Sequence, residues 1–214
     1  MREWVIQEII KKKVIAIVRG FHDEECVLLA RALHEGGVDL LEVTFDQVCA
    51  EERLHTVKTI KTLIREMGDK MVFGAGTVTT TKMVMQAKEA GAQFIVSPNT
   101  DKKVIRATVE NGMVSIPGAL TPTEIKFAHD CGGDFIKVFP ACNMGISYFK
   151  NIHAPLSDCR LLAVGGVSAA DAKDYFAAGC CGVGVAGCLF KKEWVVDKEW
   201  DRIVEATRKF LASI

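Results

Sequence analysis

Short apolar runs recur along the chain and predict strands. Five of them follow a helix-like end and a glycine, in the segments Glu35 to Phe45, Glu89 to Pro98, Glu110 to Gly118, Asp130 to Pro140 and Ala177 to Gly187. Glycine after a helical pattern is the usual C-terminal stop of a helix, and the β-branched run behind it is typical of a buried parallel strand. Three more apolar runs complete a set of eight, at Val14 to Val18, Met71 to Gly74 and Leu161 to Val164.

Amphipathic stretches between these runs predict helices. They cover Asp23 to Glu35, Glu51 to Met67, Thr80 to Ala90 and Ala169 to Ala178, with terminal helices expected at Glu3 to Lys12 and Asp197 to Leu211. Eight evenly spaced strand–helix units predict an α/β fold, a closed (β/α)8 TIM barrel with an extra N-terminal helix. A doubly wound open sheet is the alternative. The even spacing, and the absence of G-x-G-x-x-G after a strand, favour the barrel.

The charge balance removes several classes of partner. The 214 residues include 27 lysines and arginines and 27 aspartates and glutamates, so the net charge is zero at pH 7. We therefore expect no nucleic acid and no anionic membrane as partner. No apolar run has the length of a membrane span, and Met1-Arg2-Glu3-Trp4 lacks the apolar core of a signal peptide. With no linker rich in proline or serine, residues 1–214 are expected to form one cytoplasmic domain.

The cysteines and histidines give no metal-binding pattern. Eight cysteines and five histidines are present, but there is no C-x-x-C and no H-x-x-x-H. A structural zinc site needs four clustered ligands, so no metal is expected. In a cytoplasmic protein the thiols stay reduced.

Lys137 attracts attention because it interrupts an apolar strand. The run Phe135 to Phe139 otherwise reads as buried, and lysine is rarely buried without a reason. Side chains alternate along a strand, so Ile136 and Val138 should face the helices while Lys137 faces the barrel interior. An apolar interior favours the neutral form of an amine, which is a nucleophile toward carbonyls. Lys137 is therefore a candidate for Schiff-base chemistry.

Glu42 shows the same anomaly in the run Leu40 to Thr44. Alternation places Leu40, Glu42 and Thr44 on one face of the strand. Glu42 and Lys137 belong to the second and sixth predicted strands, and alternate strands contribute to the same interior layer of an eight-stranded barrel. The two side chains are therefore expected to face each other across one pocket. The alternative is a structural ion pair that compensates two buried charges.

Other polar residues at strand ends are weaker candidates, because the active sites of such barrels lie at the C-terminal ends of the strands. Arg19 follows the first predicted strand and is either an anion ligand or a surface residue. The segment Gly74 to Thr77 is either part of the site or a plain turn. Gly165 and Gly166, with a helix expected to begin near Ser168, are suited to place backbone N–H groups against a phosphate.

Six motifs together resemble one known family. They occur in the order Leu41-Glu42-Val43-Thr44, Gly74-Ala75-Gly76-Thr77, Phe94 to Pro98, Ile116-Pro117-Gly118, Phe135 to Pro140 and Gly165-Gly166-Val167. In these motifs the chain resembles the 2-keto-3-deoxy-6-phosphogluconate (KDPG) aldolases, also called 4-hydroxy-2-oxoglutarate (KHG) aldolases. The resemblance extends from Val14 to about Phe190.

The resemblance implies a class I aldolase that needs no metal or cofactor. Lys137 matches the lysine that forms an imine with the C2 ketone of the substrate. Glu42 matches the glutamate that takes a proton from the C4 hydroxyl as the C3–C4 bond breaks. The implied partners are a 2-keto-3-deoxy-6-phospho sugar acid or 4-hydroxy-2-oxoglutarate, and the products are pyruvate and an aldehyde such as glyceraldehyde 3-phosphate. Family members are commonly homotrimers.

The remaining implied site residues fall into two groups. Substrate-binding positions are matched by Arg19, Thr44, Thr77, Pro98 and Phe139. Phosphate-binding positions are matched by Gly165, Gly166 and Gly187.

Three departures from the family pattern concern the choice of substrate. Val164 stands where many members have threonine, Ala186-Gly187 where many have Gly-Ser, and Asp46 where some have arginine. These changes remove two hydroxyl groups and one cation from the expected site. They leave open the phosphogalactonate epimer, an unphosphorylated 2-keto acid and an oxaloacetate-type decarboxylation through the same imine. A barrel that binds a sugar phosphate without catalysis is the alternative from another class.

Overall fold

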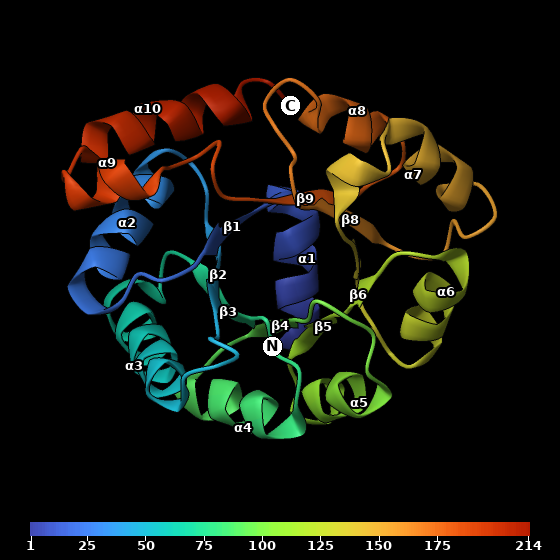
Figure 1. Ribbon diagram of the computed structural model, residues 1–214, viewed down its shortest axis with the longest axis horizontal. Helices are drawn as coiled ribbons and strands as arrows, with labels where there is room; N and C mark the ends of the chain where they lie inside the picture. The colour runs from blue at the N-terminus through green and yellow to red at the C-terminus, as the bar shows by residue number, and fades with distance from the viewer.

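The computed structural model describes residues 1–214 as a ring of parallel strands surrounded by helices (Figure 1). The strands are β1 (Val14–Val18), β2 (Leu40–Thr44), β3 (Val72–Gly76), β4 (Phe94–Val96), β5 (Val114–Ile116), β6 (Gly118–Ala119), β7 (Ile136–Val138), β8 (Leu161–Val164) and β9 (Gly182–Val185). They pair in the order β5-β4-β3-β2-β1-β9-β8-β7-β6. The predicted α/β barrel is confirmed.

Eight long helices and two short ones accompany the strands. They are α1 (Arg2–Lys12), α2 (Asp23–Glu35), α3 (Ala50–Met67), α4 (Thr81–Ala90), α5 (Lys102–Glu110), α6 (Pro122–Asp130), α7 (Ile146–His153), α8 (Ala172–Ala177), α9 (Lys192–Val196) and α10 (Trp200–Leu211), with a 3-10 turn at Ala141–Asn143. None has the combination of length and apolar character that a membrane span requires.

The fifth predicted strand is divided in two at Pro117. Its first half, β5, pairs with β4, and its second half, β6, pairs with β7. Lys137 N donates to Pro117 O at 2.9 Å and Phe135 N donates to Ser115 O at 3.3 Å, so both halves contact the β7 segment and close the ring. Pro117 has no N–H to donate, and the chain changes its strand partner at this residue.

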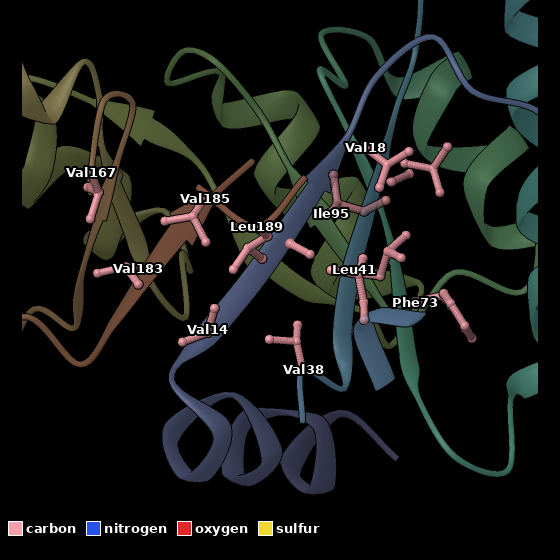
Figure 2. Packing of buried hydrophobic residues seen from close by; sticks show 14 of the residues in the cluster. Val14, Val18, Val38, Leu41, Phe73, Ile95, Val167, Val183, Val185 and Leu189 are labelled. Atoms are coloured by element: carbon pink, nitrogen blue, oxygen red, sulfur yellow. The ribbon is translucent and has the colours of Figure 1, made fainter. Parts of the chain in front are cut away.

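Side-chain alternation separates two hydrophobic clusters. The larger cluster lies between strands and helices and includes Leu41 and Ile136 (Figure 2 shows part of it). The smaller cluster fills the barrel interior and includes Leu40 and Phe135. Neighbouring residues of one strand thus enter different clusters, as the alternation predicts.

Helix α1 closes one end of the barrel. Its Val5, Ile6 and Ile9 are buried in the interior cluster, and Figure 1 shows the helix across the centre of the ring. Arg2 pairs with Asp134 at 2.7 Å, and Asp134 in turn accepts a hydrogen bond from Ser115 N at 2.9 Å. The interior therefore remains open to ligands only at the other end, where the strands terminate.

Two predicted helix boundaries are wrong. The C-terminal helix begins at Trp200 rather than Asp197, because Lys198 has a φ of +57° that interrupts the helical backbone after α9. Helix α8 begins at Ala172, because Asp171 Oδ1 accepts hydrogen bonds from Ser168 N and Oγ and holds a turn ahead of the helix.

Candidate active site

A cavity of about 570 Å³ lies at the C-terminal ends of the strands. Nine of the ten residues predicted for the site line it: Arg19, Glu42, Thr77, Pro98, Lys137, Phe139, Gly165, Gly166 and Gly187. They come from seven different strands or the loops that follow them, which is the usual construction of a barrel active site.

Lys137 lies at the inner part of this cavity. Its residue is only 7% exposed, and its backbone is fixed by pairing with β6 and β8. Its Nζ lies 4.9 Å from the centre of the Phe139 ring, a cation–π distance. Phe139 also lines the cavity and is 40% exposed, so its ring contacts both the Lys137 side chain and the solvent.

Glu42 shares the cavity with Lys137 and is 2% exposed. Burial raises the pKa of its carboxyl group, while the charges of Lys137 and Arg19 act in the opposite direction. Gly76 makes room for this side chain, because a Cβ at that position would overlap Glu42 Oε1. No ion pair within 4.0 Å joins Glu42 to Lys137 or Arg19. The arrangement differs from the close structural ion pair considered above.

Arg19 and Thr77 form the polar rim of the cavity. Arg19 Nη2 donates a hydrogen bond to Thr77 Oγ1 at 2.9 Å. Arg19 is solvent-exposed, so its guanidinium also remains accessible to an anion entering the cavity. This pairing places one positive charge and one hydroxyl beside Glu42.

Thr44 is absent from the residues that line this cavity. It borders a neighbouring space of about 90 Å³, together with Arg19 and Asp46. Its hydroxyl is buried without a hydrogen-bond partner in the protein. Asp46, which follows the same strand, accepts hydrogen bonds from Val48 N at 2.7 Å and Cys49 N at 2.6 Å. These backbone bonds lower the pKa of Asp46 and commit its carboxylate to the turn before α3.

The part of the cavity that follows β8 and β9 is lined by backbone. Gly165 and Gly166 have φ angles of +95° and +77°, and a Cβ at Gly166 would collide with the Cys142 side chain. The N–H groups of Gly166, Val167 and Gly187 have no acceptor within the protein. Outward-facing N–H groups in such loops form an anion-binding concavity.

The predicted helix N-terminus does not contribute to this part of the cavity. Helix α8 starts six residues after Gly166, and the intervening turn is held by Asp171. Cys142 packs against Gly166 but is exposed and lies outside the cavity lining.

Several lining residues were not predicted, among them Ile17, Ser168 and Cys188. Ile17 is an apolar strand residue like many others, and Cys188 lies in a loop whose path the pattern does not specify. Ser168 had a usable signal, because Ser followed three residues later by Asp is typical of a side-chain-stabilised turn.

One group of potential metal ligands comes together on the opposite side of the fold from the cavity residues. The ligand atoms of His129, Asp158 and Cys159 lie within 4.8 Å of one another. The ammonium group of Lys126 is a charged neighbour of Asp158 and Cys159 and opposes a cation there. None of these residues lines the cavity.

The fold and the cavity define a barrel enzyme in which one buried amine and one buried carboxyl group share a single site. Residues 5–206 match the family described as KDPG and KHG aldolase. The chain therefore belongs to this family of carbon–carbon lyases, and the predicted resemblance is confirmed.

Individual relatives agree with this assignment. The chain is 33% identical over 189 residues to the 2-dehydro-3-deoxy-6-phosphogalactonate aldolase of Escherichia coli K12, which covers 88% of this chain and 89% of that protein. It is 37% identical over 155 residues to the KHG/KDPG aldolase of the same organism, over 72% of this chain and 70% of that protein.

Solved structures show the same fold. A native KDPGal structure superposes with a TM-score of 0.83 at 31% identity, covering 94% of this chain and 93% of that one. The KDPG aldolase of Legionella pneumophila superposes with a TM-score of 0.82 at 26% identity, with 92% of each chain covered. In that crystal structure pyruvate was captured at low pH as a covalent carbinolamine.

Proposed function

We propose that this protein is a class I aldolase that reversibly cleaves a 2-keto-3-deoxy-6-phospho sugar acid or 4-hydroxy-2-oxoglutarate to pyruvate and an aldehyde. The observation that carries the proposal is the buried Lys137 amine facing the same cavity as the Glu42 carboxyl group, without an ion pair between them. An amine that is not held in an ion pair is available to attack a carbonyl.

The reaction begins at Lys137. Its neutral Nζ adds to the C2 carbonyl carbon. The carbinolamine hydroxyl takes a proton from solvent and leaves as water, which gives a protonated imine. The Glu42 carboxylate then takes the proton of the C4 hydroxyl. The C3–C4 bond breaks, the aldehyde leaves, and the bonding electrons move toward the iminium nitrogen to give an enamine.

The cycle closes with proton return and hydrolysis. Glu42, now protonated, returns the proton to C3 of the enamine. Water then adds to the carbon of the protonated imine, pyruvate is released, and the neutral Lys137 amine is regenerated as one proton returns to solvent. Burial raises the pKa of Glu42, which suits a group that must both accept and donate a proton near neutral pH.

The cavity offers binding groups for both charged ends of such a substrate. Arg19 supplies the positive charge for the carboxylate of the keto acid, with Thr77 beside it. The free N–H groups of Gly166, Val167 and Gly187 are suited to a phosphate. The carboxylate of Asp171 lies near these N–H groups and accepts a hydrogen bond from Ser168. Its negative charge should weaken the binding of a phosphate.

Trapping with borohydride tests the proposal. Reduction in the presence of pyruvate should attach a stable adduct to Lys137, located by peptide mass mapping. Lys137→Ala should form no adduct and show no cleavage while keeping its circular dichroism spectrum. The exposed Lys102→Ala is the matched control and should react like the wild type. Wild-type turnover by a folded Lys137→Ala protein would rule out the imine mechanism.

The phosphogalactonate epimer is the second candidate substrate, because Val164 presents only methyl groups where many family members have threonine. No hydroxyl is then available from β8 to bind the C4 hydroxyl of the substrate. Two relatives that this chain matches over more than 80% of their length are a phosphogalactonate aldolase and a probable phosphogalactonate aldolase. Values of kcat/KM for the two phosphorylated epimers, and for oxaloacetate as an alternative keto acid, would separate the candidates.

We also propose a cytoplasmic homo-oligomer, a trimer by family resemblance. All eight cysteines are free thiols, as a reducing compartment requires. Val48 and Leu54 are 93% and 61% exposed, and such apolar residues are suited to a subunit contact.

A further inference from the structure

Thr77 has a strained backbone at the rim of the cavity. Its φ angle is +56°, a left-handed value that is a genuine outlier for a β-branched residue. In this conformation Thr77 Oγ1 accepts the hydrogen bond from Arg19 Nη2. Strained backbone persists only where the surrounding structure holds it in place, so the contacts around Thr77 matter for the cavity.

The chain on either side of Thr77 is held by backbone bonds. Phe45 N donates to Gly76 O at 2.9 Å, and Val78 N donates to Val96 O at 3.1 Å. The carbonyl of Thr77 itself receives no backbone donor. Its protein donor is the side chain of Gln47, whose Nε2 lies 2.7 Å from Thr77 O.

Gln47 is itself oriented by its surroundings. Its Oε1 accepts a hydrogen bond from Thr79 Oγ1 at 2.9 Å, so both ends of the amide are engaged by the segment that follows β3. The loop that carries Gln47 is held by the Asp46 turn and by Arg53 Nη1, which donates to Gln47 O at 3.2 Å. Gln47 does not line the cavity.

We propose that Gln47 is a positioning residue of the active site. Its amide holds the Thr77 peptide in the left-handed conformation, and Thr77 in turn directs its hydroxyl to Arg19. Through this chain of contacts, Gln47 sets the geometry with which Arg19 meets the carboxylate of a 2-keto acid. The proposal rests on the aldolase function proposed above.

Pyruvate binding measures this role directly. Borohydride trapping as a function of pyruvate concentration gives a half-saturating concentration and a maximal rate for each variant. Gln47→Ala should raise the half-saturating concentration about threefold to tenfold, the range for one lost hydrogen bond, with a maximal rate close to that of the wild type. Gln47→Glu keeps an acceptor for Thr79 but has no donor for Thr77 O, so its effect should be at least as large. Gln86→Ala removes a nearby amide without these contacts and should have no effect.

A double-mutant cycle separates positioning from general stability. In a Thr77→Ala background no hydroxyl remains to be directed, so adding Gln47→Ala should not raise the half-saturating concentration further. Multiplicative effects in the double variant would overturn the proposal, as would unchanged pyruvate binding in the folded Gln47→Ala and Gln47→Glu proteins. A wild-type protein that forms no pyruvate adduct would instead contradict the aldolase function itself.

Discussion

At the scale of single residues, Glu42 determines the pH dependence expected of the reaction. Desolvation raises the pKa of its carboxyl group, although the nearby charges of Lys137 and Arg19 oppose the shift. Only the ionised form can take the C4 proton. The rate of cleavage should therefore increase with pH. The midpoint of this increase should lie above the ordinary pKa of glutamate, which is near 4.3.

Glu42→Gln tests this assignment. The amide has nearly the same shape but cannot accept the proton, so kcat for cleavage should fall about 10²–10⁴-fold, the usual contribution of a general base. Trapping of pyruvate on Lys137 should persist, because addition of the amine does not need this carboxylate in the scheme above. Steady-state kinetics between about pH 4 and 9 should also show that the acid limb has disappeared. If the variant keeps the same decrease in rate at low pH, that decrease must come from the titration of another group.

At the scale of the elements, the strands position the reacting side chains, and α1 closes the end of the barrel opposite the cavity. Residues Val5, Ile6 and Ile9 of α1 enter the interior cluster beneath the cavity. Ile9 is fully buried. The helix therefore lies at the end of the barrel that contributes to stability rather than to catalysis.

Ile9→Ala should destabilise the protein by about 2–5 kcal/mol, because it leaves a cavity in the interior cluster. The loss should appear in urea unfolding as a lower midpoint with little change of slope. Pyruvate trapping in the folded variant should remain close to wild type, since the substitution lies at the other end of the barrel. Lys11→Ala, on the exposed face of the same helix, is the control and should change the unfolding free energy by less than about 0.5 kcal/mol.

The elements were predictable where local patterns determine them. The alternation in Leu40 to Thr44 and around Lys137 specified which side chains face the interior, and the structure confirms it. The division of one strand at Pro117 was not predictable, because it depends on which neighbour each half finds when the ring closes. The position of Thr44 also depends on closure: alternation groups it with Glu42, but in the structure it borders a separate space.

At the scale of the whole molecule, the barrel assembles a site that no local pattern contains. Lys137 and Glu42 are almost a hundred positions apart in the sequence, and only the ring brings them into one cavity. Their buried charges were a sufficient signal to single them out. Gln47 gave no such signal, because its role depends on the path of the loop after β3 and on the left-handed backbone of Thr77.

The burial of Glu42 also affects the stability of the entire fold. The folded pKa of Glu42 is raised above the value in the unfolded chain, so the folded state holds this proton more tightly. The corresponding stabilisation is fully present below the unfolded pKa, near 4.3, and is lost as the pH rises through the folded pKa. At neutral pH the raised pKa of Glu42 therefore reduces the free energy of unfolding relative to its value at low pH.

Glu42→Gln removes this ionisation and should make the protein as stable as the wild type, or more stable, at pH 7–8. The difference should shrink as the pH falls and disappear well below the unfolded pKa of about 4.3, where the wild-type carboxyl group is protonated in both states. Urea unfolding of both proteins at several pH values measures the difference, with the exposed Glu205→Gln as control. A structural ion pair between Glu42 and Lys137 predicts the opposite sign, because loss of one partner leaves a buried charge uncompensated and typically costs 3–5 kcal/mol. The sign of one stability difference thus separates a site retained for chemistry from a pair retained for structure.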